Sequence, residues 1–242
     1  MLVDWLDRTL YSQYSNNWDD ESLRALILQR LRPSMSVLEI GAGAGRIKQM
    51  DFRGICTGVV GIDPDLRVMQ NPFLRTAVPG FADKLPFADN SFDLVFADNV
   101  LEHLDNPAAA FREIARVLRE GGSFLAKTPN KIHYMTLIAR ATPTSFHRLV
   151  NRLRGRANVD TFPTRYLINS RRDVRLLALR CGLGVERIQL IEGRPEYLRF
   201  SAITYLFGWL YERVVNSSSL LAPFRIVLLI ELKKPARSSE IH

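Results

Sequence analysis

Cysteine is scarce in this chain, which contains only Cys56 and Cys181 among its 242 residues. The two are isolated in the sequence and show no metal-ligand spacing, so they support neither a disulfide framework nor a metal-binding cysteine motif. A chain with so few cysteines is typical of a protein in a reducing compartment. We expect both side chains to be small core residues.

Long apolar runs are also missing. No stretch reaches the roughly 18 consecutive apolar residues that a membrane-spanning helix needs. The first ten residues carry Asp4 and Asp7 and lack the basic-then-apolar order of a signal peptide. We therefore expect a cytoplasmic protein. Its apolar content of 47% and charged content of 24% are ordinary for a globular chain, and they predict one domain over residues 1–242.

The most informative motif is VLEIGAGAGR at residues 37–46. Its short apolar run predicts a buried parallel strand, and that strand ends at three alternating glycines, Gly41, Gly43 and Gly45. Asp63 ends a second apolar run 22 residues after Gly41, where a nucleotide-binding α/β unit places the carboxylate that accepts ribose hydroxyls. The pattern therefore predicts a nucleoside-containing cofactor.

The spacing of the glycines separates the candidate cofactors. The dinucleotide fingerprint G-x-G-x-x-G needs a glycine where this chain has Arg46, and the third glycine here comes one residue earlier. With Glu39 in front, the order E-x-G-x-G-x-G resembles motif I of the class I S-adenosylmethionine-dependent methyltransferases. The resemblance implies S-adenosyl-L-methionine as cofactor and S-adenosyl-L-homocysteine as product. This cofactor has a ribose, an adenine and an amino-acid tail to hold, but no pyrophosphate.

Three further blocks extend the resemblance over roughly residues 35–130. Residues 85–95, LPFADNSFDLV, look like the LPF-x-D-x-SFD-x-V block of the methyltransferase type 11 group, and residues 100–104, VLEHL, match the segment that follows it. Residues 118–126, LREGGSFLA, resemble the L-x-PGG turn into the fifth strand, with Glu120 in place of proline. Four blocks in the right order are far more specific than any one of them.

The resemblance implies a Rossmann-like α/β fold, a doubly wound sheet of seven strands whose last strand is antiparallel. We expect N-terminal capping helices in residues 1–34, a cofactor-binding core in 35–130, and substrate-side helical insertions in 131–181, after the fifth strand, and 193–223, between the sixth and seventh. The expected strands include residues 37–40, 58–62, 93–97, 184–191 and 224–232. The expected helices are residues 4–14, 20–31, 107–120, 131–140, 144–154, 170–181 and 195–216.

The same resemblance implies a set of cofactor-binding residues. One position departs from the family pattern, because Phe81 stands where an aspartate usually binds the adenine amino group. Either the carboxylate of Asp83 reaches the adenine, or the adenine is held by backbone atoms and by apolar contact with Phe81; we favour backbone contacts at Ala82 and Asp83. The implied binding set is Glu39, Gly41, Ala42, Gly43, Gly45, Asp63, Pro64, Ala82, Asp83, Asp98 and Asn99.

Methyl transfer from a sulfonium is an in-line displacement whose leaving group needs no proton. Positioning of the nucleophile can therefore supply up to about 7–11 kcal/mol, and a general base adds roughly 10²–10⁴-fold for an oxygen acceptor. His103, just beyond the fourth strand, is the first candidate for that base; the alternative is that it packs beneath the cofactor. Weaker candidates are His133, Tyr134 and His147 for the base, and Tyr11 and Tyr14 for a place near the sulfonium, where simple packing is an equal alternative.

A metal site is the next possibility to weigh. In ubiquinone-biosynthesis O-methyltransferases, a similar segment after the fourth strand binds a divalent cation through two glutamates and a histidine. The matching positions here are Asn99, Glu102 and His103, so an amide replaces one carboxylate and weakens any affinity for magnesium. We therefore expect no metal.

Charge is distributed unevenly along the chain. Residues 1–130 contain 14 basic and 17 acidic residues, a net charge of −3, whereas residues 131–242 contain 19 and 8, a net charge of +11. This asymmetry predicts an anionic partner for the second half. Arg194, Arg199 and Arg213 flank an apolar, aromatic helix there. This composition suits an anionic membrane surface or a phosphate-bearing, lipid-linked or glycan acceptor, although the aromatic residues could instead pack against the sheet or a second subunit.

Nucleic acid is the competing anionic partner. Enzymes that methylate exocyclic base amines carry a D/N-P-P-Y/F segment after the fourth strand, but residues 98–101 read DNVL, with neither proline nor aromatic residue. Methylation at pyrimidine C5 needs a positioned cysteine, and neither Cys56 nor Cys181 follows a strand suitably. A basic face can still bind phosphates without sequence readout.

The sequence thus predicts a methyltransferase that methylates an oxygen of a small-molecule, glycan or lipid-linked acceptor. The alternatives are an RNA methyltransferase and a catalytically silent, methyltransferase-like interaction module.

Overall fold

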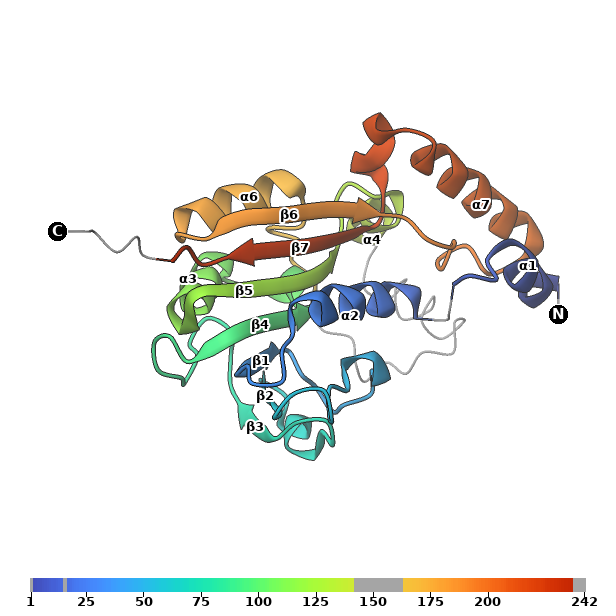
Figure 1. The fold of residues 1–242 in the computed structure, drawn as a ribbon. Helices are drawn as coiled ribbons and strands as arrows, with labels where there is room; N and C mark the ends of the chain where they lie inside the picture. Colours follow the sequence, from blue (N-terminus) through green and yellow to red (C-terminus); the bar gives the residue numbers. More distant parts are fainter. Residues whose placement is uncertain (1, 15–16, 142–162, 237–242) are drawn as a thin grey trace.

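A computed structural model describes residues 2–14, 17–141 and 163–236. Its centre is a seven-stranded sheet in the order β3-β2-β1-β4-β5-β7-β6 (Figure 1). The strand β7 runs antiparallel to both β5 and β6, while the other pairs are parallel, so the predicted fold is confirmed. The strands are β1 (Val37–Ile40), β2 (Val59–Asp63), β3 (Thr76–Pro79), β4 (Phe92–Asp98), β5 (Leu118–Pro129), β6 (Gly184–Ile191) and β7 (Val227–Lys233).

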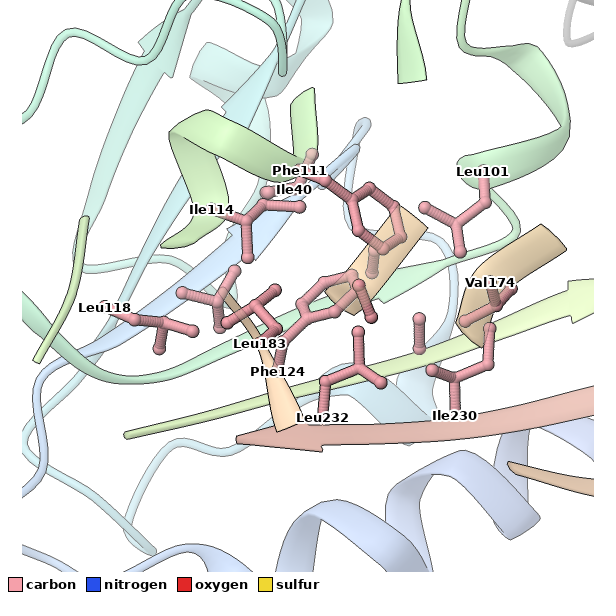
Figure 2. Packing of buried hydrophobic residues seen from close by; sticks show 14 of the residues in the cluster. Ile40, Leu101, Phe111, Ile114, Leu118, Phe124, Val174, Leu183, Ile230 and Leu232 are labelled. Carbon is pink, nitrogen blue, oxygen red and sulfur yellow. The ribbon is translucent and has the colours of Figure 1, made fainter. Parts of the chain in front are cut away.

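Helices cover both faces of this sheet. Alternate residues of a strand point to opposite faces, so each central strand supplies apolar side chains to two cores. One core lies under α3 and α6, where Phe111 packs edge-to-face on Phe124 at a centroid distance of 5.8 Å (Figure 2). The other lies under α2, which crosses the opposite face. The helices are α1 (Leu2–Leu10), α2 (Trp18–Arg30), α3 (Pro107–Val117), α4 (Tyr134–Ala141), α6 (Arg171–Arg180) and α7 (Ala202–Asn216).

Several predicted boundaries were wrong. The first helix ends at Leu10 and does not continue to residue 14. The helix predicted over residues 107–120 ends at Val117, because Leu118 already pairs with Phe92 as the first residue of β5. The aromatic helix starts at Ala202 and not at residue 195, since Ser201 and Thr204 form a capping box that defines its N-terminus.

Other boundaries follow the prediction closely. The strand over residues 184–191 is confirmed as β6, and Ser170 caps α6 by accepting a hydrogen bond from the amide of Asp173. The helix predicted over residues 144–154 lies outside the described residues. Short 3₁₀ turns complete the fold: η1 (Lys48–Met50), η2 (Leu66–Gln70), η3 (Leu101–His103) and η5 (Ser219–Phe224). Among the described residues, no helix is both long and apolar enough to span a bilayer.

Candidate active site

A cavity of about 440 Å³ opens at the carboxyl ends of β1, β2 and β4. The strand order reverses here, because β2 and β3 lie on one side of β1 whereas β4 and β5 lie on the other. Open α/β sheets bind ligands at such a reversal. A second cavity of about 250 Å³ adjoins it, and both are lined by Gly41, Pro64, Val100 and His103. The first cavity is lined by nine residues of the predicted cofactor set, which are Glu39, Gly41, Ala42, Gly43, Gly45, Asp63, Pro64, Asp98 and Asn99.

The remaining two members of that set, Ala82 and Asp83, line the second cavity together with Phe81. Phe81 is 65% exposed, so its ring is open to solvent at this cavity. The structure therefore places the backbone of residues 81–83 and an apolar ring at one wall, next to the cavity that holds the other predicted residues. Both ways of binding an adenine that the sequence left open remain compatible with this wall.

The glycine loop is shaped by neighbouring side chains. Gly41 and Gly45 adopt φ angles of +75° and +71°, which favour glycine. A Cβ atom on Gly41 would lie 2.2 Å from Cγ2 of Val100, and one on Gly45 would lie 2.4 Å from Oδ1 of Asn71. These two glycines are therefore required by packing within the protein, and the open space in front of Gly43 is where the loop meets the cavity.

Two polar side chains hold this loop in place. Asp63 is buried, and its Oδ2 accepts the amide hydrogen of Gly43 at 2.9 Å while its Oδ1 accepts that of Asp65 at 2.8 Å. Asn71 donates from Nδ2 to the carbonyl of Ala42 at 2.8 Å. Asn71 could not be predicted from the sequence, since an asparagine near a 3₁₀ turn has no distinctive local pattern.

Two further carboxylates lie buried beside Asp63. Burial, together with the negative charges of Asp98 and Asp63, raises the pKa of Glu39 well above its usual range. Burial likewise raises the pKa of Asp98, although the ammonium group of Lys127 opposes that shift. Oδ1 of Asp98 lies 3.0 Å from the ammonium nitrogen of Lys127, whereas its Oδ2 has no hydrogen-bond partner among the described residues. Such an unsatisfied buried acceptor marks a place for a cationic or hydrogen-bond-donating group.

Lys127 is a central residue of the site that the motifs did not predict. Its side chain is fully buried on β5, and its Nζ lies 3.0 Å from Oδ1 of Asp98 and 2.8 Å from Oδ2 of Asp19, with Asp20 as a third partner. Burial alone would lower the pKa of Lys127, but these carboxylates together raise it. A single lysine inside the apolar strand FLAKTP is the sequence signal for such a group. A lysine is almost never fully buried unless an acidic residue pairs with it, so this position indicates a buried ion pair.

His103 lies where the two cavities meet, as the predicted general base should. Its Nδ1 is 2.9 Å from the carbonyl oxygen of Pro163, so Nδ1 carries a hydrogen and Nε2 is the basic nitrogen of the neutral ring. Burial lowers the pKa of His103, although the hydrogen bond to Pro163 opposes this. The imidazole is therefore neutral at pH 7, which is the form that can accept a proton.

Glu102 points away from this junction. Its Oε2 accepts a hydrogen bond from the hydroxyl of Thr128 at 2.8 Å, and Asn169 donates to the same hydroxyl oxygen at 2.6 Å. Burial raises the pKa of Glu102 to about 7. Nowhere in residues 2–14, 17–141 and 163–236 do three histidine, cysteine or carboxylate side chains gather as a metal site would require.

The weaker candidates lie elsewhere. Tyr11 is buried against α7, where its hydroxyl donates to Glu212 at 3.0 Å, and Tyr14 packs on Trp18; neither lines the two cavities. His133 is buried among tyrosines, its pKa lowered to about 3 by burial, and it lines neither cavity. His147 lies outside the described residues.

The residues at the main cavity fit S-adenosylmethionine. Three carboxylates, Glu39, Asp63 and Asp98, gather at the ends of three adjacent strands, with Lys127 as the counterion of Asp98. Two of them are buried with raised pKa values, so an arriving cation would stabilise their ionised forms. The α-ammonium and sulfonium groups of this cofactor are such cations, and its ribose hydroxyls are donors for the oxygens of Asp63.

Comparison with known proteins agrees with this fit. Residues 38–126 match the family model described as "Methyltransferase domain". The chain is 28% identical over 130 residues to cycloartenol-C-24-methyltransferase 1 of Oryza sativa subsp. japonica, covering 46% of this chain and 38% of that protein. It is 32% identical over 137 residues to sterol 4-C-methyltransferase strm-1 of Caenorhabditis elegans, covering 48% and 41%. The chain thus spans about two fifths of the length of these relatives.

A similar fold occurs in the solved structure of the [4+2]-cyclase SpnF, with a TM-score of 0.57 and 18% identity over 89% of this chain and 81% of that one. At this identity, the likeness concerns the fold alone. The name of that protein also shows that this architecture can serve a reaction other than methyl transfer, so function has to be argued from the site.

Proposed function

We propose that this chain transfers a methyl group from S-adenosylmethionine to an oxygen of an amphiphilic or anionic acceptor. Residues 38–126, which match the methyltransferase-domain model, would supply the cofactor site. The acceptor would be a small molecule, a glycan or a lipid-linked compound. The observation that carries this proposal is the position of His103 at the junction of the two cavities, with its tautomer set by Pro163.

The chain's own residues have three tasks in this reaction. The glycine loop and Asp63 hold the nucleoside part, while Glu39 and Asp98 supply negative charge at the ends of β1 and β4. Bound S-adenosylmethionine supplies an electrophilic methyl carbon. His103 then orients an acceptor hydroxyl and takes its proton at Nε2, which raises the nucleophilicity of the oxygen. Most of the remaining acceleration comes from positioning.

An amphiphilic acceptor is favoured by two observations. Two of the relatives are named for cycloartenol and for sterols, which are largely apolar molecules. The second cavity also presents Phe81, Leu104 and Pro163 beside the polar junction. Those relatives are named for methylation at carbon, and the neutral imidazole of His103 is the feature that favours oxygen here. An RNA acceptor has no comparable support, because residues 98–101 lack the aromatic residue that would stack on a base.

The experiment that tests the proposal has two parts. Titration calorimetry of the full chain with S-adenosylhomocysteine should show one site, and no heat would indicate an interaction module without a cofactor site. Incubation with S-adenosylmethionine labelled in the methyl group, and with sterol, polyprenyl-phosphate and glycolipid pools, should then label a lipid-extractable product. Label that enters added RNA and no lipid pool would overturn the proposed acceptor class.

His103→Gln should lower kcat for methyl transfer by about 10²–10⁴-fold, because the amide cannot accept the proton. The Kd for S-adenosylhomocysteine should change less than about threefold, since the proposed role concerns the acceptor. In the wild type, kcat/KM should fall only below pH 6.5, because burial lowers the pKa of His103 and keeps the ring neutral above that pH. The variant should lack this acidic limb, and full turnover by the variant would exclude His103 as the base.

A further inference from the structure

The helix α7 exposes an apolar stripe to solvent. Ile203, Leu206, Phe207, Leu210 and Val214 follow the spacing of one helical face, and all five are about half exposed or more, with Ile203 at 70% and Phe207 at 66%. We call these five residues the α7 stripe. All residues of α7 are described, and its only exposed charged side chain is that of Arg213, which is half exposed and lies 3.4 Å from the Glu212 carboxylate.

The opposite face of α7 is where its carboxylate lies. Tyr205, Glu212 and Val215 are buried, and the Glu212 carboxylate accepts hydrogen bonds from the Tyr11 hydroxyl and from Asn216. A helix on the surface of a globular protein ordinarily shows the reverse, with charge outside and apolar residues inside. The α7 stripe is therefore not an incidental scatter of surface residues; it has the composition of an interaction surface.

Two neighbouring elements add to this exposed apolar area. The helix α1 packs on α7, with the Tyr205 hydroxyl donating to Asp7 at 2.7 Å, and it exposes Leu2 and Trp5. The turn η5 follows α7 and exposes Leu220 at 86%. Tryptophan and arginine beside aliphatic residues are typical of surfaces that lie at the level of lipid headgroups.

The net charge of the chain favours a membrane over a second copy of the chain as the partner of the α7 stripe. The whole chain has a net charge of +8, and its second half has +11. Arg194 and Arg199, which flank α7 in the sequence, form ion pairs with Asp7 and Glu196, so they join α1 to the segment that precedes α7. Of the acidic groups near α7, Glu212 is buried and Asp7 and Glu196 are ion-paired, while Asp4 of α1 is exposed. A second copy would carry the same net charge of +8 and be repelled, whereas an anionic bilayer attracts a chain of this charge.

The position of the α7 stripe suits delivery of an acceptor. In Figure 1, α1 and α7 lie beyond the carboxyl ends of β5 and β6, which is the end of the sheet where the cofactor cavity opens. A protein resting on these helices would therefore face the bilayer with the same end of the sheet that carries His103.

We propose that the α7 stripe, with α1 beside it, docks this chain on anionic membrane surfaces, from which an amphiphilic acceptor reaches the methyl-transfer site. The acceptor part of this statement rests on the proposed function; the docking part does not. The helix would lie in the plane of the interface, with its apolar side chains among the acyl chains and Arg213 at the phosphates.

The test uses the full chain with phosphatidylcholine vesicles that contain or lack phosphatidylglycerol. The wild type should co-sediment with the anionic vesicles, and the variant Ile203→Ser, Phe207→Ser, Leu210→Ser should bind about tenfold or more weakly. The matched control is Leu176→Ser, Leu179→Ser, which removes exposed leucines from α6 and should bind like the wild type. Both variants should keep the wild-type Kd for S-adenosylhomocysteine, which shows that they are folded and separates docking from the proposed function.

Three results would overturn the docking proposal. These are no binding of the wild type to anionic vesicles, equal binding by the α7 variant, and a wild-type dimer in analytical ultracentrifugation that the α7 variant converts to monomer. The last result would assign the stripe to a second copy. If the chain bound anionic vesicles but showed no heat of binding with S-adenosylhomocysteine, the docking proposal would be supported and the proposed function refuted.

Discussion

At the scale of single residues, Asp63 holds the glycine loop in place with both oxygens of its carboxylate. Each of its oxygens accepts one backbone amide, from Gly43 in the loop and from Asp65 after β2, and each keeps a further lone pair for a ribose hydroxyl. The carboxylate therefore shapes the loop, and in the proposed function it would also accept the ribose hydroxyls.

Asp63→Ala should weaken S-adenosylhomocysteine binding by roughly 10- to 150-fold, because hydrogen bonds to a charged group contribute about 1.5–3 kcal/mol each. Titration calorimetry measures the change. Asp89→Asn, at an exposed carboxylate outside both cavities, is the control and should bind like the wild type. An unchanged Kd for the alanine variant would refute the ribose-binding role of Asp63.

Glu102 contributes a pH dependence to stability. Its pKa of about 7 in the folded protein exceeds the ordinary value of 4.5, so between these pH values the folded state holds a proton that the unfolded state has released. The contribution of this group to stability is therefore complete below pH 4.5 and is lost as the pH rises through 7.

Glu102→Gln should remove that component while keeping an oxygen to accept the hydrogen bond from Thr128. Urea unfolding at pH 5 and pH 8 should show a smaller decline in unfolding free energy for the variant than for the wild type. Parallel declines in the two proteins would mean that Glu102 is ionised throughout this range.

At the scale of elements, the attachment of α2 to the sheet depends on Lys127. The ammonium group joins Asp19 and Asp20 of α2 to Asp98 at the end of β4, so the N-terminal helix is tied to a strand that lines the cofactor cavity. Apolar contacts of Leu23 and Ile27 with the same face of the sheet support this attachment.

Lys127→Met should cost about 3–5 kcal/mol of unfolding free energy, because it leaves buried carboxylates without their counterion. Urea denaturation gives this value, and adding Asp19→Asn and Asp20→Asn to the same chain should recover part of it. A loss below about 1 kcal/mol would show that water or another cation replaces the lysine.

At the scale of the whole molecule, cofactor binding and folding are linked. The cavity is built by three strands and by loops that join them, so the unfolded chain has no site. Saturating S-adenosylhomocysteine, at 100 times its Kd, should therefore raise the unfolding free energy by about 2.7 kcal/mol. Urea unfolding with and without the ligand checks this, and stabilisation of Asp63→Ala at the same ligand concentration should be clearly smaller. Equal stabilisation of both would place the ligand elsewhere.

Much of the fold could be predicted because its signals are local. The apolar runs, the glycines after Ile40 and the serine cap of α6 act between residues that are close in sequence. The helix ends were harder to place, since Leu118 leaves α3 only because Phe92 offers it a strand partner. The role of each site residue remains a prediction, although all eleven members of the cofactor set line one of two adjoining cavities.

The sequence by itself determined the class of cofactor, because Glu39 and the three glycines form a short-range pattern tied to one backbone turn and Asp63 ends the next strand. Only the tertiary structure decided the partner of Lys127, which lies 108 residues from Asp19, and the orientation of His103, which depends on Pro163. The same holds for α7. Its sequence is apolar and aromatic all round, and packing against α1 decides which residues are buried and which form the exposed stripe.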